Sequence, residues 1–182
     1  MTKIEVFKKQ FEYYRYLAEK SVEQLEPSQL FKVPSGGVNS IAVIMKHIAG
    51  NMLSRWTNIF EEDGEKEWRE RDEEFINRFK DKEELMEYWN RGWAVLFETL
   101  DRIDVEDLER IIYIRNMGCT VHDAIIRQIC HYPYHIGQIV FVAKLFKGTS
   151  FTSLSIPLNT SKSFNDERFD KDKSIKHFTD DK

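Results

Sequence analysis

The chain has 182 residues, of which 41% are hydrophobic and 32% are charged, and its formal net charge is −4 at pH 7. This length suits one domain with a substantial buried core. The small acidic excess argues against a nucleic-acid partner, which needs a basic face, and no apolar run approaches the roughly 20 residues of a membrane span.

Two amphipathic segments predict the first two helices. The first runs from Lys3 to Leu25 with apolar residues at helical spacing, and Pro27 ends it. The second begins near Asn39 or Ser40, both good N-cap residues, and extends to about Phe60. A charged connection reaching Glu74 is expected after it.

Two capping pairs predict the start of the other two helices. Asp81 with Glu84 is a capping-box arrangement that opens a helix whose buried side consists of Leu85, Trp89, Gly92, Leu96 and Ile103. Thr120 with Asp123 opens a helix that reaches about Phe146. Between them we expect a short helical turn at residues 104–107 and a brief extended piece at residues 111–114.

Beyond residue 149 the helical period is lost, and after Ser161 the chain is mostly polar. Such a segment has too little apolar surface to offset the entropy of ordering it. We therefore predict a bundle domain over residues 1–160 and a flexible polar tail over residues 161–182, partly disordered. The predicted fold class is all-α, a four-helix bundle with short extra turns.

The fourth predicted helix contains His131 and His135, an HxxxH pair. Residues four apart lie above one another on a helix, so both imidazoles can reach one ion. Both histidines flank the apolar stripe of the helix, beside Gln128, which is expected to hydrogen-bond a histidine from outside the site. Two histidines hydrogen-bonded at the margin of a core would give the same pattern, so the pair alone does not decide.

On the second predicted helix His47 occupies a similar margin and is aligned with Asn51, which is expected to support the site from outside it. One interpretation is a solvated polar face. The other is a polar groove between the second and fourth helices, in which His47, His131 and His135 hold one divalent metal ion and leave a fourth position open, as in catalytic zinc sites. Periodicity alone leaves both interpretations open.

Several other sites are excluded. The HxxxH pair lacks the glutamate that HExxH metalloproteases use as a base. The two cysteines form no CxxC pair and suit a reducing cytoplasm, and we predict that Cys130 is a small buried residue rather than a ligand. No glycine-rich phosphate loop, GxSxG elbow or signal-peptide core is present, so a cytoplasmic protein is predicted.

The chain resembles the DinB superfamily of YfiT-like metalloenzymes. That family has one histidine on helix two and an HxxxH followed closely by Gly-Gln on helix four, which match SIAVIMKHIAGN at residues 40–51 and HYPYHIGQI at residues 131–139. Further similarity at residues 51–56 and 154–157 indicates one particular branch, and the resemblance reaches about Asn165. The family pattern has no counterpart of Pro133, which is expected to kink the helix between the two ligands.

The resemblance implies an up-down-down-up bundle, a homodimer, and zinc or nickel on His47, His131 and His135. Characterised members include transferases that use low-molecular-weight thiols such as bacillithiol or mycothiol. We therefore expect a metal-dependent enzyme with a small-molecule substrate, which activates a thiol for S-transfer to an electrophile. The alternatives are a hydrolase that uses metal-bound water and a non-catalytic dimeric bundle with a structural or vestigial metal.

Overall fold

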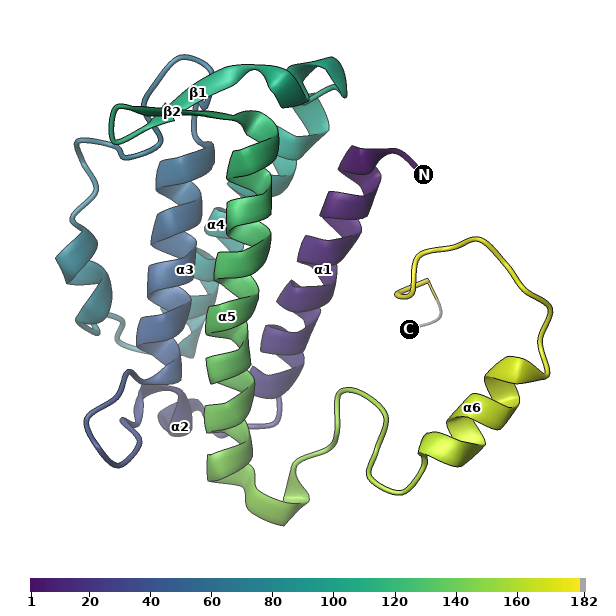
Figure 1. Ribbon diagram of the computed structural model, residues 1–182. Helices are drawn as coiled ribbons and strands as arrows, with labels where there is room; N and C mark the ends of the chain where they lie inside the picture. Colours follow the sequence, from purple (N-terminus) through teal and green to yellow (C-terminus); the bar gives the residue numbers. More distant parts are fainter. Residues whose placement is uncertain (181–182) are drawn as a thin grey trace.

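The computed structural model describes residues 1–180 and is a four-helix bundle (Figure 1). Its long helices are α1 (Lys3–Val22), α3 (Ile41–Trp56), α4 (Lys82–Arg102) and α5 (Val121–Lys147). The shorter elements are α2 (Pro27–Phe31), η1 (Arg71–Phe75), η2 (Glu106–Glu109), η3 (Gly148–Ser150), α6 (Ser161–Phe169) and the antiparallel pair β1 (Ile111–Ile114) and β2 (Met117–Thr120). The prediction of an all-α four-helix bundle is confirmed.

The four long helices run up-down-down-up. Figure 1 shows α1 and α5 running in one direction and α3 in the other. The helices α3 and α4 are parallel neighbours, because Gly92 faces Ala49 and the hydroxyl of Thr99 donates to the carbonyl oxygen of Trp56 at 2.9 Å. A Cβ atom on Gly92 would lie 2.8 Å from the Cα atom of Ala49, so this glycine permits the close approach of the two helices.

Each long helix begins at a side chain that caps it. The side-chain oxygens of Thr2, Ser40, Asp81 and Thr120 accept hydrogen bonds from backbone N–H groups in the first turns of α1, α3, α4 and α5. These bonds satisfy N–H groups that have no partner within the helix. Three of these caps, at Ser40, Asp81 and Thr120, are the ones that the sequence predicts.

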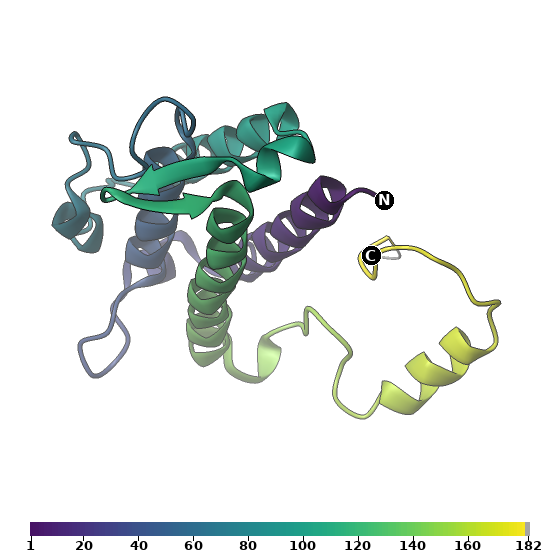
Figure 2. The ribbon, with the colours of Figure 1, turned by 45° about the horizontal axis from the view of Figure 1, so that its top comes forward.

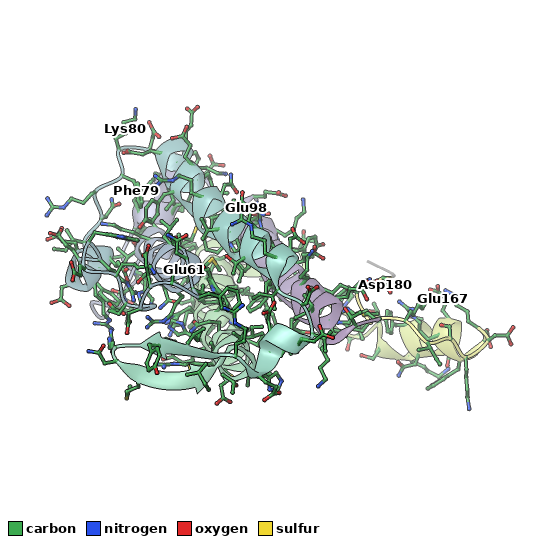
Figure 3. The ribbon with its side chains drawn as sticks, turned by 90° about the horizontal axis from the view of Figure 1, so that it is seen from above. Glu61, Phe79, Lys80, Glu98, Glu167 and Asp180 are labelled. Carbon is green, nitrogen blue, oxygen red and sulfur yellow. The ribbon has the colours of Figure 1, made fainter. Side chains whose placement is uncertain are left out.

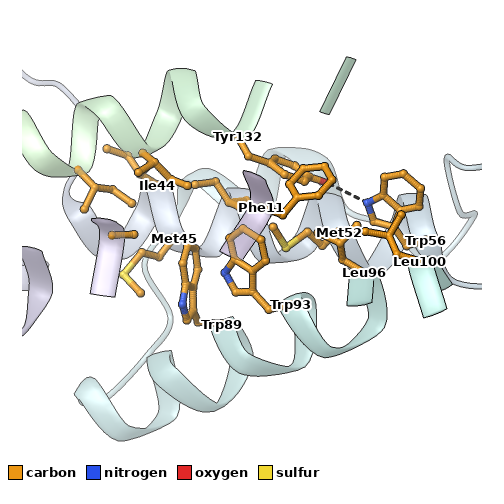
Figure 4. Close-up of a cluster of buried hydrophobic side chains, with 14 of the residues drawn as sticks. Phe11, Ile44, Met45, Met52, Trp56, Trp89, Trp93, Leu96, Leu100 and Tyr132 are labelled. Carbon is orange, nitrogen blue, oxygen red and sulfur yellow. Dashed lines mark hydrogen bonds between the residues drawn. The ribbon is translucent and has the colours of Figure 1, made fainter. Parts of the chain in front are cut away.

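Large aromatic side chains fill the centre of the bundle (Figure 4). Trp56, Trp89 and Trp93 are buried there, whereas Trp68 is 59% exposed. The indole N–H of Trp56 donates to the hydroxyl of Tyr132 at 3.1 Å, and that hydroxyl donates to the amide oxygen of Asn51 at 3.1 Å. This chain of bonds satisfies buried polar groups and ties α3 to α5.

The connection between α3 and α4 is more ordered than a charged linker. The helix α3 ends at Trp56, four residues before the predicted end, and η1 packs against it. The ammonium group of Lys46 donates to the backbone oxygens of Glu73 and Ile76 at 2.7 and 2.8 Å. The charged connection therefore packs on the side of α3 that carries Lys46. The remaining side chains of α3 are all buried.

The predicted extended piece is the first strand of a hairpin that crosses one end of the bundle (Figure 2). The carboxylate of Asp63 accepts hydrogen bonds from the backbone N–H groups of Arg115 and Asn116 in its turn. Both turn residues have positive φ, 56° and 60°, which suits a two-residue hairpin turn. The loop after α3 and the hairpin are thus held together.

The C-terminal segment leaves the bundle at α6 and contacts it again near its end, where the ring of Phe178 packs edge-on against that of Tyr13. It contains α6, which has no buried residue and stands apart from the other helices in Figures 1 and 2. The chain then returns to α1, where Asp180 forms an ion pair with Lys9 (Figure 3). The division into a bundle domain and a flexible tail stays a prediction. Within residues 1–180, no helix combines the length and the apolar character needed to cross a bilayer.

Candidate metal centre

Two antiparallel helices bring three histidines together. His47 lies on α3, while His131 and His135 lie one turn apart on α5. His47 is buried and the other two are half-buried. The interpretation of His47 as part of a solvated face is therefore wrong, because η1 covers that side of α3 and Phe75 stacks on the His47 ring at a centroid distance of 4.9 Å.

The three rings converge on a common point. The centroid of the His47 ring lies 5.4 Å from that of His131 and 4.8 Å from that of His135, and the two α5 rings are 4.8 Å apart. One ring nitrogen from each histidine lies within 4.8 Å of the others, and the Nε2 atoms of His131 and His135 are 3.1 Å apart. Among residues 1–180 this is the one group of histidine, cysteine or acidic side chains with metal-site spacing.

Glu74, which the sequence placed in a solvated linker, holds His47. Its Oε2 atom accepts a hydrogen bond from Nδ1 of His47 at 2.8 Å. The guanidinium of Arg69 donates to both carboxylate oxygens, from Nε to Oε1 at 2.8 Å and from Nη2 to Oε2 at 3.0 Å. Burial opposes the charge of Glu74, but the hydrogen bonds from His47 and Arg69 and the charge of Arg69 outweigh it, so the pKa of Glu74 is lowered.

Gly50 makes room for this carboxylate. A Cβ atom at Gly50 would lie 2.5 Å from Oε1 of Glu74, well inside van der Waals contact. Gly50 is one turn beyond His47 on α3, so the absence of a side chain there lets η1 approach the helix at the histidine. Gly50 belongs to the segment that resembles the DinB superfamily, and the close approach of Glu74 explains why this position is glycine.

Two glutamines hold the other histidines in the same way. The amide oxygen of Gln128 lies 3.1 Å from Nδ1 of His131, and the amide oxygen of Gln138 lies 3.1 Å from Nδ1 of His135. All three Nδ1 atoms therefore face an oxygen acceptor, which places their protons on Nδ1 and leaves each Nε2 lone pair available. Gln128 contacts His131. Gln138 was not singled out, although it belongs to the Gly-Gln pair of the resembling motif.

Three other expectations have different outcomes. The amide oxygen of Asn51 binds the hydroxyl of Tyr132, a core contact and not a histidine contact. Cys130 is exposed, and the prediction that it is buried is wrong, because it lies on the outward face of α5. Pro133 lies inside α5, and the helix is continuous from Val121 to Lys147. The proline does not separate the two histidines.

The environment keeps the α5 histidines neutral. Burial is the main cause that lowers the pKa of His131 to about 4, with further lowering by the neighbouring His135 and His47. Burial likewise lowers the pKa of His135, against the opposing hydrogen bond to Gln138. Imidazole binds metals in its neutral form, so both side chains are ready to act as ligands at neutral pH.

The kind of donor, and the spacing of the two donors on α5, fit a divalent metal ion. Nitrogen ligands of a tetrahedral zinc ion at the usual bond length are roughly 3.3 Å apart, close to the 3.1 Å between the Nε2 atoms of His131 and His135. With protons on both Nδ1 atoms, these two lone pairs face each other without a hydrogen between them. A cation removes that repulsion. Three imidazole ligands leave the remaining position of such an ion for another molecule.

Comparison with known proteins supports the fold and the family. A family model described as "Protein of unknown function (DUF1572)" matches residues 2–160. A solved structure, "Crystal structure of the conserved protein of locus from Enterococcus faecalis", is similar with a TM-score of 0.64 and 20% sequence identity, covering 82% of this chain and 99% of that one. This similarity shows the fold alone. No curated protein matches the chain.

The family match covers the whole bundle, including all three histidines and Glu74, and stops where the C-terminal segment leaves the bundle. The wider resemblance to the DinB superfamily is compatible with this family and this fold, and it depends on the residues quoted above. The chain belongs to the DUF1572 family.

Proposed function

We propose that this protein is a metal-dependent transferase that binds one divalent ion through His47, His131 and His135 and transfers a low-molecular-weight thiol to an electrophile. The observation that carries the proposal is the convergence of three imidazoles whose Nδ1 atoms are each held by an oxygen acceptor. Zinc and nickel are the proposed ions, since both accept imidazole ligands. In the overall reaction a carbon–sulfur bond forms, the leaving group departs with its electron pair, and the thiol proton passes to solvent.

The ion would supply Lewis acidity, which lowers the pKa of a sulfur or oxygen donor beside the histidines. The protein's own side chains hold the three rings in one tautomer. Glu74, fixed by Arg69, keeps a proton on Nδ1 of His47. Phe75 covers the His47 ring and limits the access of water from that side.

The histidine group favours a thiol over water as the activated nucleophile. A hydrolase needs a base to handle the proton of the attacking water. Both oxygens of Glu74 are engaged by His47 and Arg69, and within the described residues no other carboxylate belongs to the histidine group. A thiol ionises more readily than water, so it has less need of such a base.

Metal analysis of the purified protein and a thiol-conjugation assay test the proposal together. We expect about one zinc or nickel ion per chain, and conjugation of a small thiol to 1-chloro-2,4-dinitrobenzene that a chelator abolishes. His47→Ala is expected to lose both, whereas His122→Ala, a histidine outside the group, is expected to keep both. A wild-type protein without metal, or conjugation that survives the chelator, would contradict the proposal.

The hydrolase alternative predicts a different pair of results. Cleavage of an activated ester such as p-nitrophenyl acetate would then depend on the metal, and conjugation would not.

We also propose that the protein is a homodimer and is located in the cytoplasm. Light scattering of the same protein sample tests the homodimer, and subcellular fractionation tests the cytoplasmic location.

A further inference from the structure

A surface cavity begins one helical turn from the histidines. It has a volume of about 700 Å³ and lies between α5 and the loop that precedes α3. Ile44, one turn before His47, and Gln138, one turn after His135, both line it. Figure 1 shows this loop and the C-terminal half of α5 at the same end of the bundle. We call this cavity the α5 groove.

The α5 groove is mostly apolar and without charge. Val38, Tyr134, Phe141 and Leu145 line it, and each of them is more than half exposed. None of the described residues that line it is charged, in a chain in which 32% of residues are charged. Its volume lies within the range of about 300–1,000 Å³ that is usual for small-molecule sites. An exposed apolar surface of this kind marks a binding surface, here for an uncharged group.

Gly137 lies in this groove without a structural reason for being glycine. A Cβ atom there would meet no heavy atom within 4 Å, in contrast to Gly50 and Gly92, where neighbouring atoms require the glycine. Gly137 is helical and is not among the residues with positive φ. Glycine inside a helix is less stable than alanine. Its effect on the protein is to leave the groove open.

Two contacts connect the groove to the histidine group. The amide oxygen of Gln138, a lining residue, lies 3.1 Å from Nδ1 of His135. The ring of Tyr134, also a lining residue, packs edge-on against the His135 ring at a centroid distance of 4.9 Å. A molecule in the groove therefore lies one side chain away from the proposed ligands.

From these observations we infer that the α5 groove binds the uncharged, largely apolar body of the electrophile whose reactive end lies at the histidines. This inference rests on the proposed function for the identity of the molecule as an electrophile. The groove's ability to bind an apolar body is independent of the metal. The two parts can therefore be tested separately.

The first test uses the uncharged fluorescent probe N-phenyl-1-naphthylamine and metal-free protein. Gly137→Leu is expected to weaken probe binding at least tenfold, because its side chain occupies the groove. Gly137→Ala, the matched control, is expected to change it by less than threefold. Phe141→Ser removes apolar lining and is expected to weaken binding as well, so the test stands even if Gly137→Leu does not fold. Equal binding by wild type, Gly137→Leu and Phe141→Ser would overturn the inference.

The second test asks whether the groove leads to the histidines. Straight-chain alkanethiols of increasing length serve as probes of this connection: the sulfur binds the metal of cobalt-substituted protein, and the chain enters the groove only if the groove opens toward the histidines. Thiol coordination is followed by its charge-transfer absorption. Each buried methylene is worth up to about fourfold in affinity, and we expect at least twofold per methylene for wild type and no dependence on length for Gly137→Leu. A flat series in wild type would overturn the inference while leaving the metal site intact. Failure to bind cobalt would contradict the proposed function. Binding of N-phenyl-1-naphthylamine to metal-free protein would still test whether the groove binds an apolar molecule.

Light scattering separates this inference from its competitor, a second copy of the chain in the groove. If wild type is a dimer and Gly137→Leu is a monomer, the groove is an interface between copies and the inference is overturned. An unchanged oligomeric state with weakened probe binding supports it.

Discussion

Replacement of Glu74 by glutamine tests whether this carboxylate organises the candidate metal centre. The carboxylate accepts three hydrogen bonds, one from His47 and two from Arg69, and both partners are buried. Removing one partner of a buried ion pair usually costs 3–5 kcal/mol. Glutamine keeps one acceptor oxygen and Arg69 keeps its bond to Glu65 at 3.0 Å, so we expect a smaller loss of about 2 kcal/mol.

The effect on the metal is expected to be larger than the effect on folding. Loss of the group that orients a histidine ligand typically weakens metal binding 10- to 100-fold. Zinc affinity measured by competition with a chromogenic chelator should therefore fall about 10- to 100-fold in Glu74→Gln. Glu73→Gln is the matched control, because Glu73 is half-exposed and pairs with Arg78 at the surface; it should change neither affinity nor stability by more than about 0.5 kcal/mol.

Gly50→Ala separates the position of the carboxylate from its charge. The added Cβ atom would lie 2.5 Å from Oε1 of Glu74, so the carboxylate must move while remaining present. Alanine also favours the helix by about 1 kcal/mol, which offsets part of the strain. We expect unfolding free energy within about 1 kcal/mol of wild type and zinc affinity at least about tenfold weaker. Wild-type zinc affinity in both Gly50→Ala and Glu74→Gln would refute the role given to this carboxylate.

Three further outcomes follow from the structure. Burial lowers the pKa of His131 to about 4 and also lowers that of His135, so the unfolded chain binds more protons below the ordinary histidine pKa of 6.5. The metal-free protein should therefore lose stability as pH falls from about 6.5 toward 4, which urea unfolding in a chelator-containing pH series would measure. Gly92→Ala should destabilise the bundle by about 1–2 kcal/mol in urea unfolding, because its Cβ atom would meet the backbone of Ala49. Removal of residues 161–182 should leave the melting temperature within about 2 °C and zinc affinity unchanged, since α6 buries nothing and the contacts of Asp180 with Lys9 and of Phe178 with Tyr13 lie at the surface, where such contacts contribute little; a larger shift would show that the tail is part of the domain.

The sequence predicts the bundle because its helices are locally consistent. Ser40, Asp81 and Thr120 carry capping oxygens at the points where apolar periodicity begins, and the structure uses all three. Periodicity and caps are local signals, and so they mark where helices start. The parallel arrangement of α3 and α4 depends on long-range packing such as Gly92 against Ala49. It came from the family resemblance and not from periodicity.

Part of the histidine group could also be predicted from local signals in the sequence. His131 and His135 are one helical turn apart, so their proximity follows from local geometry. His47 is more than eighty residues away in sequence, and on periodicity alone its margin position on α3 favours a solvated face. Only tertiary packing, with η1 over that side of α3, makes it buried.

Glu74 could not be predicted as a site residue, because the charged residues around it are typical of a segment exposed to solvent. It lies in a run of acidic and basic residues whose ordinary interpretation is an exposed linker. The available signals were Phe75, an apolar residue next to this run, and Gly50, a helical glycine one turn beyond His47. Neither signal identifies its partner without the fold, because the contact joins segments 24 residues apart and depends on how the loop returns.

The arrangement of these groups lowers the stability of the folded protein, and this cost is itself an argument for function. Three imidazoles are placed at the margin of the core, where burial lowers the pKa of His131 to about 4, and two of their Nε2 lone pairs face each other at 3.1 Å. Buried polar groups normally have partners, and here the protein supplies partners to every Nδ1 atom through Glu74, Gln128 and Gln138 while leaving the Nε2 atoms to one another. A core selected only for stability would place apolar side chains there. Natural sequences break such local rules mainly at functional sites, and the ligand that would satisfy three convergent, neutral imidazole nitrogens is a divalent metal ion.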